Sequence, residues 1–130
     1  MKKKILAFVV LAAMLLNLLP VYAAGGAAFE AETVAVNPGE TAKVNIWVKN
    51  SPGITSFAVD IAYDTAAMTL TAIERGDSNG MSFVTSPPEK LANSPVNVRG
   101  VEGSFLDISG DWLLAVLTFQ VKAEAAPGSY

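Results

Sequence analysis

Apolar and polar side chains alternate with a period of two along residues 41–49 and 55–63, and this alternation is the strongest constraint on the fold. Successive side chains of a β-strand point to opposite faces, so a period of two gives each strand one buried face and one exposed face. The pattern therefore predicts two strands that cover a core. The predicted inward residues are Ala42, Val44, Ile46 and Val48 in the first strand, and Phe57, Val59, Ile61 and Tyr63 in the second.

Further strands are predicted where short apolar segments lie between turn-forming residues. These segments are residues 29–36, 68–73, 82–85, 95–101 and 113–122. In residues 113–122 the predicted core face is Ala115, Leu117, Phe119 and Val121. Predicted turns lie at Pro38-Gly39, at residues 50–53, at Pro87-Pro88 and at residues 109–111. No segment shows a sustained helical period and there is no internal repeat, so the chain is predicted to be an all-β protein with a β-sandwich fold.

The N-terminal segment has the organisation of a secretory signal peptide. Lys2, Lys3 and Lys4 precede an apolar run at residues 5–19, and Pro20 ends that run. A membrane-spanning helix needs about 20 apolar residues, whereas this run is shorter and contains Asn17. We therefore predict cleavage after Ala23, a mature domain at residues 24–130 with no membrane span, and a secreted protein.

The chain contains no histidine and no cysteine. The commonest general base, the thiol nucleophile, disulfides, thiolate metal sites and a lipoprotein anchor are thereby excluded. Asp60, Asp64, Glu74 and Asp77 are the mid-chain carboxylates that could form a glycosidase pair, but strand and turn positions are the stronger explanation for them. No calcium-binding loop of the EF-hand spacing is present. The sequence predicts a protein that is not an enzyme and carries no metal or other cofactor.

The charge of the chain argues against two classes of partner. Without the three lysines of the signal peptide, six basic residues face twelve acidic ones, a formal charge of −6. Nucleic acids and anionic membranes both require a basic surface, so neither is an expected partner.

A series of short motifs gives the chain a family resemblance. In order, they are Asn37-Pro38-Gly39-Glu40, Pro52-Gly53-Ile54, Tyr63-Asp64, Gly76-Asp77, residues 117–122 with the sequence LTFQVK, and Ala126-Pro127-Gly128-Ser129-Tyr130. With this order and spacing the chain resembles the cohesin modules of bacterial cellulosome scaffolds. The resemblance implies a jelly-roll β-sandwich that binds a dockerin, a small calcium-loaded helical module of plant cell-wall hydrolases. It also implies a tethering role in the extracellular space or at the cell surface.

The same resemblance implies one further strand after the Pro-Gly-x-Tyr turn, so a domain at residues 24–130 is expected to lack its final strand. It also implies that residues 55–63, 95–101 and 113–122 form one flat sheet that contacts the partner. The predicted protein-binding residues are Ser56, Ala58, Asp60, Ala62, Asn97, Arg99, Leu114, Val116 and Thr118. Many cohesins similar to this chain carry an asparagine and an aspartate where this chain has Ser56 and Ala58.

Two other functions are left open by the residues themselves. A carbohydrate-binding module would present Trp47 and Trp112 side by side on one exposed surface, where sugars stack on aromatic rings, and its ligand would be a plant polysaccharide. Arg75-Gly76-Asp77 spells the tripeptide that integrins recognise, in a predicted loop.

Overall fold

The computed structural model describes residues 27–77, 81–102, 108–126 and 128–129. The predicted signal peptide lies outside these residues. The elements are β1 (Ala28–Ala31), β2 (Ala35–Val36), β3 (Thr41–Ile54), β4 (Ser56–Ile61), β5 (Met68–Arg75), β6 (Met81–Thr85), the 3₁₀ helix η1 (Pro88–Lys90), β7 (Val96–Glu102), β8 (Ile108–Val121) and β9 (Gly128–Ser129). Across the described part of the chain, no helix has the length and apolar character needed to span a bilayer.

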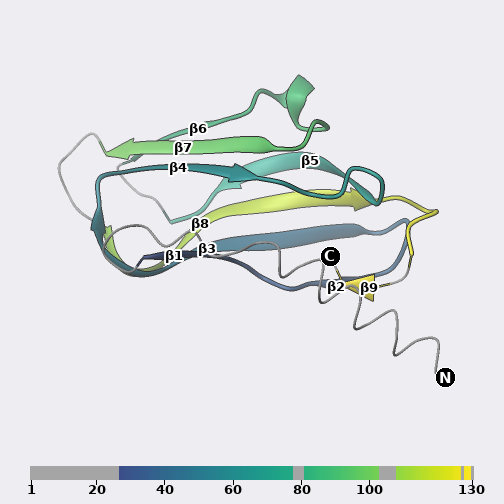
Figure 1. Ribbon diagram of the computed structural model, residues 1–130, viewed down its shortest axis with the longest axis horizontal. Helices are drawn as coiled ribbons and strands as arrows, with labels where there is room; N and C mark the ends of the chain where they lie inside the picture. Colours follow the sequence, from purple (N-terminus) through teal and green to yellow (C-terminus); the bar gives the residue numbers. More distant parts are fainter. Residues whose placement is uncertain (1–26, 78–80, 103–107, 127, 130) are drawn as a thin grey trace.

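The strands form two antiparallel sheets that pack face to face (Figure 1). One sheet has the order β1-β3-β8-β5 and the other has the order β4-β7-β6, while β2 and β9 form a short separate pair. This arrangement confirms the predicted all-β sandwich. The predicted first strand at residues 29–36 is divided into β1 and β2, which pair with different strands.

The core lies between the two sheets and is built mainly from the inward rows of their strands. All four inward residues predicted for β3 are buried, as are Phe57 and Ile61 of β4. Two aromatic pairs cross from one layer to the other. The ring centroids of Phe57 and Trp112 lie 6.0 Å apart, and those of Tyr63 and Phe119 lie 5.2 Å apart. Because burial of apolar area is the main stabilising term, these rows hold the two sheets together.

Two segments predicted to be turns are instead paired with each other. β3 continues through residues 50–53, and β8 begins before residues 109–111, so that Ser51 lies opposite Gly110 and Pro52 opposite Ser109. The pairing is irregular, with register shifts on both sides of these residues. Asn50, Gly53 and Gly110 have positive φ angles of 51°, 102° and 80°, which bend the ladder without ending it. After this bend, the chain passes from the end of β3 into the other layer as β4 (Figure 1).

Candidate functional site

The prediction that residues 55–63 and 113–122 share a sheet is wrong. β4 pairs with β7 in the three-stranded sheet, whereas β8 lies between β3 and β5 in the four-stranded sheet. The outward side chains of β4 and β8 therefore lie on opposite sides of the sandwich. The predicted binding residues cannot form one continuous surface.

The prediction that Leu114 points outward is also wrong, because its side chain is fully buried. A β-bulge in β8 explains the error. Ile46 of β3 pairs with Ala115 and the next residue, Trp47, pairs with Leu113, so Leu114 is an extra residue in the ladder. A bulge shifts the alternation by one, and both Leu114 and Ala115 reach the core with no accessible surface. Val116 and Thr118 are half-buried and do face outward, but over the four-stranded sheet.

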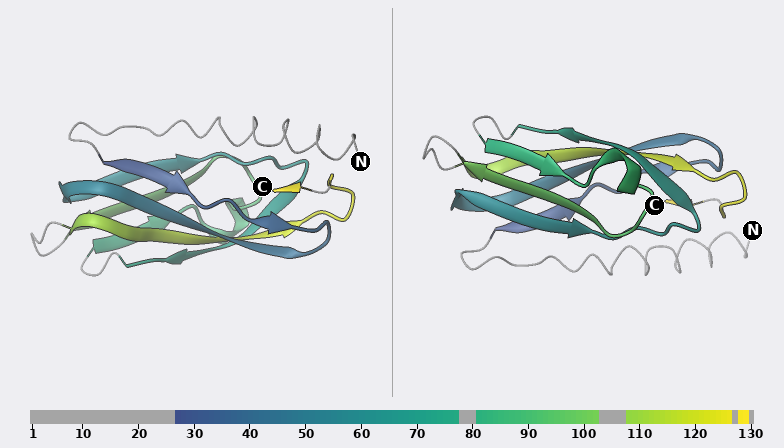
Figure 2. Two further views of the ribbon diagram at one scale, coloured as in Figure 1. Left: turned by 90° about the horizontal axis from the view of Figure 1, so that it is seen from below. Right: turned by 90° about the horizontal axis from the view of Figure 1, so that it is seen from above.

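Five of the predicted residues do lie together, on the outer face of the three-stranded sheet. We call this surface the β4–β7–β6 face, and the view from above in Figure 2 looks onto this layer. Its register gives three rows across β4, β7 and β6. The rows are Ser56–Val101–Ser82, Ala58–Arg99–Val84 and Asp60–Asn97–Ser86. Ala62 is exposed immediately after the end of β4.

Several polar groups of the β4–β7–β6 face form hydrogen bonds with one another. The Asn97 side-chain amide donates a hydrogen bond of 2.6 Å from Nδ2 to Oδ1 of Asp60, across the β4–β7 pair. The Ser82 hydroxyl donates to the carbonyl oxygen of Val101 and accepts from its N–H. Arg99 is exposed, and among the described residues its guanidinium has no hydrogen-bonding or ion-pair partner. Arg99 is thus the group on this face whose charge is available to a partner.

Two exposed valines add apolar area to the same face. Val84 and Val101 are 61% and 59% exposed, and they are the exposed large hydrophobic residues of the described chain. Neither valine was among the predicted binding residues. The alternation along residues 95–101 that places Asn97 and Arg99 outward also places Val101 outward. The central part of the face is therefore small or aliphatic around one cation, which is a surface that a protein can contact closely.

Packing beneath the face brings β7 close to the core. Gly100 of β7 lies under the Phe57 ring, and a Cβ atom at this position would be 2.3 Å from Phe57 Cε1. The absence of a side chain at Gly100 lets the Phe57 ring cross beneath β7 and reach Trp112 in the opposite sheet. The outward residues on both strands are thereby supported by a filled core.

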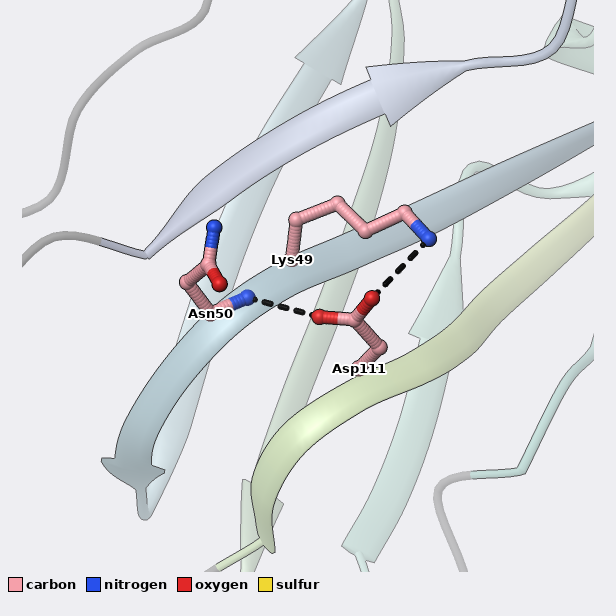
Figure 3. Close-up of polar contacts among 3 residues, drawn as sticks. All are labelled: Lys49, Asn50 and Asp111. Carbon is pink, nitrogen blue, oxygen red and sulfur yellow. Dashed lines mark hydrogen bonds and ion pairs between the residues drawn. The ribbon is translucent and has the colours of Figure 1, made fainter.

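The opposite outer face carries a charged cluster around the bend of β3 (Figure 3). Asp111 accepts a hydrogen bond from the backbone N–H of Asn50 at 2.9 Å, and its other oxygen lies 3.2 Å from Lys49 Nζ. The backbone hydrogen bond from Asn50, followed by the contact with Lys49, lowers the pKa of Asp111 from the ordinary aspartate value. This cluster ties β3 to β8 where their pairing is irregular, which is a structural role.

The two tryptophans do not share a surface. Trp47 lies on the outer face of the four-stranded sheet with Lys49 Nζ 4.8 Å from its ring centroid, whereas Trp112 is only 4% exposed and packs in the core. The aromatic platform expected of a carbohydrate-binding module is therefore not formed by these rings. Nor is Arg75-Gly76-Asp77 a free loop, because the N–H groups of Gly76 and Asp77 donate to the carbonyl oxygens of Leu114 and Leu113.

A comparison with protein families decides the classification. The sequence model of the cohesin domain matches residues 27–130, which is most of the chain. The chain belongs to the cohesin family. Cohesin domains are binding modules without catalytic activity, which confirms the prediction that this protein is not an enzyme.

Similar proteins agree with this assignment. Cellulose-binding protein A of Clostridium cellulovorans is 29% identical to this cohesin over 98 residues, which are 70% of this chain and 5% of that protein. The cohesin in a type I cohesin–dockerin complex from Clostridium thermocellum has a TM-score of 0.63 at 22% identity, with 79% of this chain and 78% of that chain covered. A type I cohesin from Pseudobacteroides cellulosolvens has a TM-score of 0.60 at 22% identity, covering 74% and 68%. These structures confirm the cohesin-like sandwich fold.

Proposed function

We propose that this cohesin binds a dockerin through the β4–β7–β6 face, and that the protein thereby tethers polysaccharide-degrading enzymes to a scaffold or cell surface. The observation that carries the proposal is the exposed surface around Arg99, which combines one available cation with Val84, Val101 and small residues of β4. Family membership supports a binding role, and several similar structures are themselves cohesin–dockerin complexes.

The chemistry of the face indicates how a helical partner is held. Ser56 and Ala58 are small, so they allow a helix to approach the β4 backbone closely. Val84 and Val101 provide apolar contact, and Arg99 can pair with a carboxylate or with the last carbonyl groups of a helix. Asp60 is held by Asn97, which orients its second oxygen toward the partner.

The positions where similar cohesins carry an asparagine and an aspartate are occupied here by Ser56 and Ala58. The usual polar anchors of β4 are therefore absent, and the binding energy is shifted to β7 and β6. We infer a dockerin of different specificity from those that recognise the two polar anchors. Calcium belongs to the partner in this proposal, and the described residues contain no cluster of three or more acidic side chains that could hold a metal ion.

Secretion is part of the proposal. The apolar N-terminal segment supports export after cleavage at Ala23, leaving a cohesin domain at residues 24–130. A location outside the cell, free or attached to the cell surface, would bring the domain to the enzymes that it tethers.

Calorimetric titration against a panel of dockerins, in calcium and in chelator, tests the proposal. We expect saturable binding in calcium that weakens by at least about tenfold, or about 1.4 kcal/mol, in Arg99→Glu and in Ala58→Arg. The matched control is Lys43→Glu on the opposite outer face, where the exposed ion pair with Glu74 contributes little to stability. Equal losses in Arg99→Glu and Lys43→Glu would refute the assignment of the face, and no binding by a folded domain to any dockerin would refute the function.

A further inference from the structure

Two opposite charges occupy diagonal positions on the β4–β7–β6 face. In the register of β4 and β7, Ala58 lies opposite Arg99 and Asp60 lies opposite Asn97. Asp60 and Arg99 are therefore one strand and two residues apart, and such diagonal neighbours are separated by about 7–8 Å. Both side chains are exposed. The face thus presents a negative and a positive group at a fixed spacing.

Neither charge is neutralised within the described part of the domain. Asp60 accepts the Asn97 hydrogen bond through Oδ1, and among the described residues no donor contacts its Oδ2. The ion pairs of the described residues lie on the other outer face, and Asp60 and Arg99 do not form one with each other. Asn97 therefore fixes one oxygen of Asp60 and leaves the other for a partner.

The two exposed valines lie on either side of the line that runs from Asp60 through Arg99. Val84 lies opposite Arg99 on β6, and Val101 lies two residues further along β7. In this register the midpoint between the valines falls on the same line, beyond Arg99. A rod laid along this diagonal therefore meets a negative group, a positive group and an apolar pair, in that order.

We propose that a dockerin helix lies along this diagonal and carries a cation, a carboxylate and an apolar residue on successive turns, which contact Asp60, Arg99 and the two valines. This inference rests on the proposed function and specifies the sequence that the face selects. Helix residues three or four apart lie on one side of the helix, about 5–6 Å from each other. The length of the Arg99 side chain bridges the remaining distance of about 2 Å to the sheet spacing.

Other helix directions leave one charge without a partner. A helix laid along β7 contacts Arg99 and Val101, but its row of contacts passes Asp60 by one strand. Its diameter of about 10 Å nevertheless covers the neighbouring strand, so Asp60 would lose water without gaining a cation. A buried charge without a partner is costly. The diagonal is the direction in which one side of a helix meets both charges.

The test uses the dockerin that binds most tightly in the calorimetric panel, loaded with calcium. We expect this dockerin to carry a basic and an acidic residue three or four apart on an exposed side of one helix. Arg99→Gln and Asp60→Asn remove the charges with little change in shape, and an asparagine at residue 60 can still accept from Asn97. Each should weaken binding about tenfold, as expected for an interfacial charge pair, and by less at high salt.

Exchange of the charges separates recognition from a structural role. The double variant Asp60→Lys, Arg99→Glu should bind this dockerin at least about 100-fold more weakly, and should regain most of that loss when the basic and acidic residues of the dockerin are exchanged as well. Lys43→Glu, on the other outer face, is the control and should change neither titration.

Two results overturn the inference and leave the proposed function standing. One is binding that Ala58→Arg blocks but that none of the charge variants changes. The other is a tightest dockerin without such a pair of charges, or one whose exchanged form does not restore binding to the double variant. If no dockerin binds the folded domain, the proposed function fails and this inference fails with it.

Discussion

Replacing Leu114 by alanine distinguishes the bulged ladder from a regular strand. In a regular strand that keeps Ala115 inward, Leu114 points to solvent and its truncation costs almost nothing. In the structure Leu114 is completely buried in the core, and truncation of a buried leucine costs about 2–5 kcal/mol from lost apolar contact and the remaining cavity. We expect a loss of about 3 kcal/mol, because the bulge holds the backbone and limits collapse around the cavity. For a domain of about 100 residues this lowers Tm by about 12–24 °C.

Urea unfolding followed by tryptophan fluorescence measures this loss, because Trp112 moves from the core into solvent when the domain unfolds. Val116→Ala is the matched control, since Val116 is on the same strand, two residues away, and faces outward. We expect Val116→Ala to cost less than about 1 kcal/mol. A cost for Leu114→Ala as small as that of the control would refute the bulge and the burial of Leu114.

Three further substitutions test the approach of Gly76 to β8, the turn before β3 and the irregular part of the β3–β8 ladder. Gly76→Ala should destabilise the domain by more than about 2 kcal/mol in urea unfolding, because the added Cβ would lie 2.1 Å from the backbone oxygen of Leu113. At Gly39 an added Cβ meets no atom within 4 Å, so Gly39→Ala should cost only the strain of the positive φ angle, about 1 kcal/mol. A similar cost at both glycines would contradict the close approach at Gly76. Asp111→Asn should lower stability at pH 7, because the folded-state pKa of Asp111 is lowered by Asn50 and Lys49. The stabilisation is fully present above the unfolded pKa of about 3.9 and is lost as pH falls through the lower folded value, so the difference between the thermal melts of the two proteins should begin to shrink below about pH 4 and disappear only below the folded pKa. A stability difference that does not shrink on acidification would exclude the ionised carboxylate as its source.

Local alternation was enough to predict most strands and several buried rows. The inward set of β3 and the outward sets of β4 and β7 follow directly from the period of two, because none of these three strands carries an extra residue between the positions concerned. The same rule failed in β8, where Leu114 and Ala115 are both buried. A bulge is determined by the pairing with β3, and a single strand does not reveal it.

Turn-forming residues misled the prediction for a related reason. Asn50, Gly53 and Gly110 adopt positive φ angles, which turns and bulges both use. Only the pairing of β3 with β8, 59 residues apart for Ser51 and Gly110, shows that they bend a ladder. The choice of neighbouring strands is likewise a long-range property, so residues 113–122 were placed in the wrong sheet. For the candidate site, parity placed five residues on one face, with Ala62 exposed just after β4. The sheet assignment removed Val116 and Thr118 from that face, and the bulge removed Leu114.

The arrangement of β1, β3 and β8 also determines how the domain would respond to a pulling force. β1 and β8 lie on either side of β3 and both run antiparallel to it. The first residue of β1, Ala28, pairs with Lys49, toward one end of β3. Near the end of β8, Gln120 pairs with Thr41, at the other end of β3. Tension applied between these points acts along the strands, so the hydrogen bonds of a strand pair share the load and do not open one at a time. The rate of unfolding, and not the equilibrium stability, therefore sets how long the domain resists such a force.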